Sequence, residues 1–127
     1  MVAATIALAL GASKARAQEP IAGEKFYTKA AILCDERVQI DELLDAMKKG
    51  DNSVNIVYKK WNEKTNPQNE PLCVLQPIQG AFVLSSTDEG NVRSNSATVH
   101  TWLLNLRGQA GITGWALYGE LVDERPA

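Results

Sequence analysis

The sequence predicts an α+β domain in which an N-terminal helical hairpin precedes a small antiparallel sheet. Apolar residues recur at helical spacing in the first half of the chain. Short runs rich in valine, leucine and aromatic residues fill the second half, and turns of glycine, proline and asparagine separate them. Because the chain has only 127 residues, we expect one domain with a modest core.

Residues 1–17 have the character of an export signal. The apolar run 2–10 is about half as long as a membrane-spanning helix, and Ala15-Arg16-Ala17 fits a small-x-small cleavage site. Lys14 and Arg16 follow the apolar run instead of preceding it, as they would if the start codon were assigned too late. We expect a periplasmic or secreted domain, 18–127, without a membrane span. The alternative is an alanine-rich tail on a cytosolic protein.

Charge disfavours nucleic acid as a partner. Cleavage after residue 17 removes two basic residues, Lys14 and Arg16, and no acidic ones, so the net charge falls from −2 to −4. Nucleic-acid affinity depends chiefly on basic residues that neutralise phosphates, and the chain has no basic stripe.

The clearest element is a helix over residues 35–49. Four apolar residues share one face, Asp35 can cap the start, and Gly50 can cap the end beyond two lysines. The four are Ile40, Leu43, Leu44 and Met47.

A second helix is expected over residues 54–64, which would complete the hairpin. Its apolar residues have the same spacing, and Ser53 can cap its start. Three β-branched residues (Val54, Ile56 and Val57) favour a strand instead, so both interpretations stay open.

The remaining segments predict a sheet. Residues 65–71 are a proline- and asparagine-rich loop, and residues 85–96 are polar and predict a long turn. The expected strands are 72–76 and 80–84, separated at Pro77, then 97–106, and finally 112–122 with a bend at Gly119, after a turn at 108–111.

Cys34 and Cys73 predict a structural disulfide. The bridge would close a loop of 39 residue steps and contribute about 3.5–4 kcal/mol on the chain-entropy model. A redox role lacks a Cys-x-x-Cys motif, and zinc would need more ligands than two cysteines and His100. We therefore expect no catalytic, metal or cofactor site at these residues.

Three aromatic residues are the candidate ligand-binding surface: Trp102, Trp115 and Tyr118. The alternative is that they fill the core. Trp115 is the best candidate for exposure because it follows Gly114 beside a glycine-rich turn. His100 shares the predicted strand with Trp102, and we expect it to be structural.

Residues 108–122 (Gly-Gln-Ala-Gly-Ile-Thr-Gly-Trp-Ala-Leu-Tyr-Gly-Glu-Leu-Val) resemble the closing strands of bacterial Src-homology-3-like domains. The matching residues are Gly111, Gly114, Trp115 and Leu121. The resemblance implies a partly open barrel that binds peptides or cell-wall peptide. The order of Leu33-Cys34, helix, second cysteine and sheet is similar to small exported bacterial proteins of unknown function.

The expected function is a small exported, non-catalytic binding domain for a protein, a peptide or a cell-envelope component. Trp115 and Tyr118 would lie at the binding surface. One alternative is an inhibitor of a secreted hydrolase that acts through a protruding loop at 85–96. The other is an enzyme in which His100 is the general base.

Overall fold

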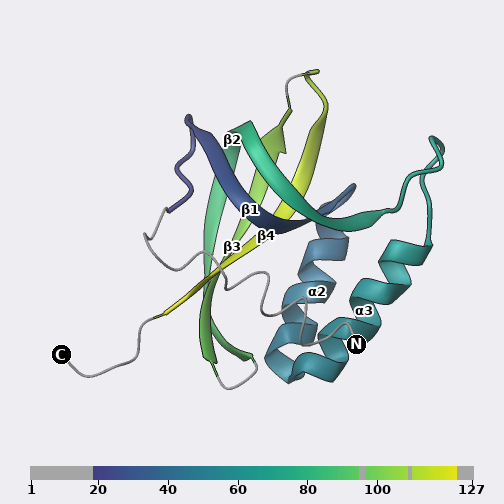
Figure 1. The fold of residues 1–127 in the computed structure, drawn as a ribbon, viewed down its shortest axis with the longest axis vertical. Coiled ribbons are helices and arrows are strands. Elements are labelled where there is room, and N and C mark those ends of the chain that lie inside the picture. Colours follow the sequence, from purple (N-terminus) through teal and green to yellow (C-terminus); the bar gives the residue numbers. More distant parts are fainter. Residues whose placement is uncertain (1–18, 95–96, 109, 123–127) are drawn as a thin grey trace.

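The computed structural model describes residues 19–94, 97–108 and 110–122. The chain forms β1 (Lys25–Cys34), α2 (Arg37–Lys49), α3 (Asp51–Glu63), β2 (Cys73–Ser94), β3 (Ala97–Arg107) and β4 (Thr113–Leu121). The four antiparallel strands close into a barrel because β4 returns to pair with β1, and both helices lie on one side of it (Figure 1). The predicted signal peptide, 1–17, lies outside the described residues.

The prediction of an N-terminal helical hairpin is wrong, because β1 precedes the helices. The hairpin is instead an insertion between two neighbouring strands, β1 and β2. In the second half of β1 the side chains of Ala31 and Leu33 pack in one apolar cluster and those of Ile32 and Cys34 in another. A strand covered on both faces loses the alternation that would identify it from sequence.

The two predicted helices are present, with different ends. The N-cap of α2 is Glu36 rather than the expected Asp35, and the Glu36 backbone N–H donates to Gln39 Oε1 at 3.0 Å. α3 begins three residues earlier than expected, at Asp51. Gly50 separates the helices with φ +126°, a value that favours glycine, so the chain turns back within a single residue.

Two apolar clusters lie on opposite faces of the barrel wall. The inner cluster contains only strand residues, including Phe26, Leu104 and Tyr118. The outer cluster joins the helices to strand residues such as Ile32 and Leu117. The barrel interior is therefore a core of its own, and the helical hairpin covers the outside of the wall.

β2 is one strand of 22 residues, where we expected two short strands and a long turn at 85–96. Pro77 lies at an irregularity in the pairing with β1, where it need not donate a hydrogen bond. Gly80 and Gly90 have φ values of +88° and +82°, and Gly90 adjoins a second irregularity, in the pairing with β3. These residues bend the strand around the barrel instead of ending it. The protruding loop expected for an inhibitor is strand up to Ser94.

Candidate functional site

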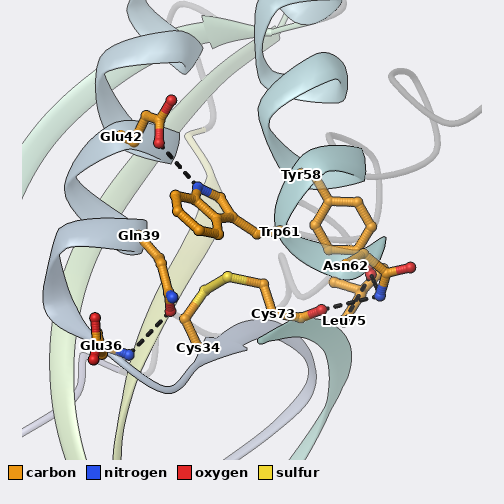
Figure 2. Close-up of a disulfide and its surroundings, with 9 residues drawn as sticks. All are labelled: Cys34, Glu36, Gln39, Glu42, Tyr58, Trp61, Asn62, Cys73 and Leu75. Carbon is orange, nitrogen blue, oxygen red and sulfur yellow. Dashed lines mark hydrogen bonds between the residues drawn. A yellow bond between two sulfur atoms is a disulfide. The ribbon is translucent and has the colours of Figure 1, made fainter. Parts of the chain in front are cut away.

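The disulfide predicted between Cys34 and Cys73 is present, at the base of the helical hairpin (Figure 2). The two residues are direct partners at the end of β1 and the start of β2. The Asp35 N–H donates to the Leu72 carbonyl at 3.0 Å, so the next pair is hydrogen-bonded and the cysteines form a non-hydrogen-bonded pair. Side chains come closest at such pairs, which suits a cross-strand bridge.

Polar contacts hold α3 against the start of β2 beside the disulfide. The Leu75 N–H donates to Tyr58 Oη at 3.1 Å, and Asn62 Nδ2 donates to the Cys73 carbonyl at 2.9 Å. Both contacts reach β2 within two residues of the bridge (Figure 2). The hairpin is therefore fixed to this end of the barrel by covalent and hydrogen bonds.

Glu42 of α2 joins the two helices to each other. Its carboxylate accepts from Lys60 Nζ at 2.6 Å and from Trp61 Nε1 at 2.9 Å, and Figure 2 shows the indole of Trp61 pointing from α3 toward Glu42. The bond from Lys60, with a smaller effect from Trp61, holds the pKa of Glu42 below its ordinary value. Glu42 is therefore ionised at neutral pH.

An apolar hollow of about 430 Å³ opens at the same end of the barrel. It lies where β1 and β3 end and β2 and β4 begin, so the closing strands leave the interior uncovered there. Its apolar lining comes from Leu33, Val74, Ala81, Leu106, Pro71 and Ile112. Ile112 is 74% exposed in the turn before β4.

Two acidic residues, Asp35 and Glu70, also line this hollow, and Asn66 contacts the side chain of the first and the backbone of the second. Asn66 Nδ2 donates to Asp35 Oδ2 at 3.0 Å, and Asn66 Oδ1 accepts from the Glu70 backbone N–H at 3.0 Å. Because the Asn66 side chain uses both ends of its amide, Asp35 and the backbone of Glu70 are positioned together at the rim.

The predicted aromatic site residues are not gathered on one surface. Trp102 and Tyr118 are 7% and 1% exposed and stack in the barrel interior with ring centroids 5.6 Å apart. Trp115 is half-buried and packs against the outer cluster, with the Arg37 guanidinium 5.7 Å from its ring. The structure therefore places the first two in the core and leaves Trp115 partly accessible beside the hollow.

His100 connects two strands at the far end of the barrel. Its Nε2 lies 2.7 Å from Asp88 Oδ1, and its Nδ1 lies 2.5 Å from Asn91 Oδ1. The Gly90 N–H, and then His100, hold the pKa of Asp88 below its usual value. Both ring nitrogens of His100 therefore have a partner on β2.

Sequence reasoning did not identify the hollow. The signals that were available are the unbroken apolar run at 30–34 and a large aliphatic residue, Ile112, within a glycine-rich turn. Neither signal shows which strand ends meet, because that depends on the closure of the barrel between β1 and β4.

The described residues contain no group of three or more histidine, cysteine, aspartate or glutamate side chains that could hold a metal ion. Within the same part of the chain, no helix has the length and apolar character needed to cross a bilayer. Comparison with family models, curated proteins and solved structures found no match.

Proposed function

We propose that this chain is a small exported, non-catalytic binding domain and that the hollow at the barrel end receives an apolar side chain of a protein or peptide. The observation that carries the proposal is the hollow itself. At about 430 Å³ it is within the range of natural ligand pockets, and apolar residues form most of its wall.

The walls of the hollow suit binding because they are held in place before a ligand arrives. Cys34 lies in the wall and is bonded to Cys73, while Tyr58 and Asn62 fix the neighbouring segment of β2. A pocket that does not need to order itself loses less entropy when it binds. Ile112 is the exposed contact that a partner would cover, because it stands at the rim.

Two substitutions in the hollow and one outside it test this function. Gly114 lines the hollow, and a Cβ there would meet only the Cys34 carbonyl, at an ordinary 3.7 Å, so Gly114→Leu fills the space without a backbone clash. Ile112→Ser removes the exposed contact. Ile56→Ser is the matched control, because Ile56 is similarly exposed, at 69%, on α3 away from the hollow.

Calorimetry measures the dissociation constant of each protein for the blocked peptide acetyl-Gly-Leu-Lys-Gly-amide. We expect Gly114→Leu to abolish binding and Ile112→Ser to weaken it about tenfold, as loss of a buried aliphatic contact does. Ile56→Ser keeps the affinity of the parent protein. Equal affinity in all four proteins, or no binding of this peptide and of its phenylalanine analogue, would overturn the proposal.

A further inference from the structure

We infer that the side chain received by the hollow is flanked by a lysine or arginine, so that the partner is a peptide segment with adjacent apolar and cationic residues. The inference rests on the proposed function and adds the chemical class of the partner. It comes from the charge distribution around the hollow.

The ionisable side chains in the wall of the hollow are both acidic. Asp35 and Glu70 line it together with apolar and uncharged residues, and no lysine, arginine or histidine of the described chain does so. Neither carboxylate forms an ion pair within the part of the chain that the structure describes. Two exposed negative charges therefore stand beside an apolar space.

The arginines on neighbouring segments are directed to other groups. Arg37 Nε lies 3.7 Å from Asp41 on α2, and its guanidinium is over the Trp115 ring. Arg107 is the last residue of β3, and its guanidinium is 5.3 Å from the centre of the Phe82 ring. Neither arginine is therefore paired with Asp35 or Glu70.

Asn66 holds the carboxylate of Asp35 and the backbone of Glu70 at the rim of the hollow. Asn66 occupies Oδ2 of Asp35, and no hydrogen bond among the described residues occupies its Oδ1. An apolar ligand alone would cover the rim and leave the carboxylates with less water and no partner, which is unfavourable. A neighbouring ammonium or guanidinium group would supply that partner, and an acidic one would be repelled.

Three blocked peptides test the inference: acetyl-Gly-Leu-Lys-Gly-amide and its analogues with glutamine or glutamate in place of lysine. We expect the lysine peptide to bind about fivefold more tightly than the glutamine peptide, which is the upper range for an exposed ion pair. The glutamate peptide binds more weakly than either. The preference for lysine decreases as salt is raised from about 0.05 to 0.5 M.

The variants Asp35→Asn and Glu70→Gln remove the charges while keeping the shapes, and the amide oxygen introduced by Asp35→Asn can still accept from Asn66. Together they abolish the preference for lysine over glutamine but leave the affinity for the glutamine peptide unchanged. Asp45→Asn, on the exposed face of α2, is the matched control and keeps the preference. If Asp35→Asn does not fold, Glu70→Gln alone reduces the preference.

The outcomes separate the two proposals. Equal binding of the lysine and glutamine peptides by the parent protein overturns the cationic partner but leaves an apolar binding site. Failure of all three peptides and of the phenylalanine analogue to bind overturns the site itself.

Discussion

Cys34 and Cys73 lie directly opposite each other where β1 ends and β2 begins, with Cα atoms 4.1 Å apart. The bond has two structural consequences. It closes the base of the helical hairpin inserted between these strands, and it fixes one wall of the hollow at the barrel end. The hairpin and the hollow therefore depend on the same covalent link.

Reduction of this disulfide is expected to lower the free energy of unfolding by about 3.5–4 kcal/mol, because the unfolded chain regains the entropy of a 39-residue loop. Urea unfolding with and without a thiol-free reductant measures the difference. The double variant Cys34→Ala/Cys73→Ala is the control, since its midpoint is insensitive to reductant. An unchanged midpoint for the reduced parent protein would contradict the stabilising role.

Glu42→Gln is expected to destabilise the protein by about 0.5–1 kcal/mol at pH 7. This is the usual contribution of a partly exposed ion pair such as the one between Glu42 and Lys60. Because the pKa of Glu42 is lowered in the folded state, its contribution is fully present above about pH 4.3 and is lost as the pH falls further. The difference between variant and parent therefore shrinks in acid. Asp45→Asn breaks a longer, more exposed pair with Lys49 and serves as the control. A difference that is constant from pH 7 to pH 3 would count against this role for Glu42.

Tyr118→Phe is expected to cost about 1–2 kcal/mol at pH 8, because the buried Glu120 loses the hydroxyl that donates to it at 2.7 Å. Burial, and then this hydrogen bond, raise the pKa of Tyr118. Above about pH 10 only the unfolded chain ionises this phenol, so the parent protein loses stability there. The cost of the substitution therefore decreases steadily as the pH rises above about 10.

Tyr27→Phe is the control for this pH dependence, since Tyr27 is 55% exposed. Denaturant unfolding at each pH measures both variants. The same trend with pH for both substitutions would contradict a raised pKa of Tyr118.

Alanine at the two bends of β2 is expected to have unequal effects. Both glycines have positive φ, which costs about 1–2 kcal/mol for alanine. A Cβ at Gly80 would also lie 3.2 Å from Tyr27 Oη, whereas at Gly90 it meets nothing within 4 Å. Gly80→Ala is therefore the more destabilising, as measured by the urea midpoint. The excess disappears in a Tyr27→Ala background, and its persistence there would rule out the contact with Tyr27 as its cause.

Local patterns in the sequence predicted the elements whose signals are local. The apolar face of α2, the end of that helix at Gly50 and the pairing of the two cysteines are all present. β1 was missed because both faces of its second half are covered, so Ala31 and Ile32 show no alternation. Pro77 and the polar segment 85–96 were interpreted as chain breaks, although β2 continues through both to Ser94 with irregularities in its pairing.

The candidate site was less predictable than the fold. Trp102 and Tyr118 were expected to meet a ligand, but only the closure of the barrel determines that their strand faces point inward. The same closure brings Leu33 and Leu106 to one hollow although they lie on different strands. Pairing between distant strands is not encoded in any short segment, so the site could not be derived from motifs.

The most direct test of the binding role is a methyl-NMR titration of the parent protein with acetyl-Gly-Leu-Lys-Gly-amide. The predicted result is that shifts concentrate on methyl groups of Leu33, Leu106 and Ile112, which line the hollow. The methyl groups of Val38 and Ile56, which are exposed on the helices, stay unchanged. Absence of shifts at the hollow, or shifts centred on the helices, would contradict the account.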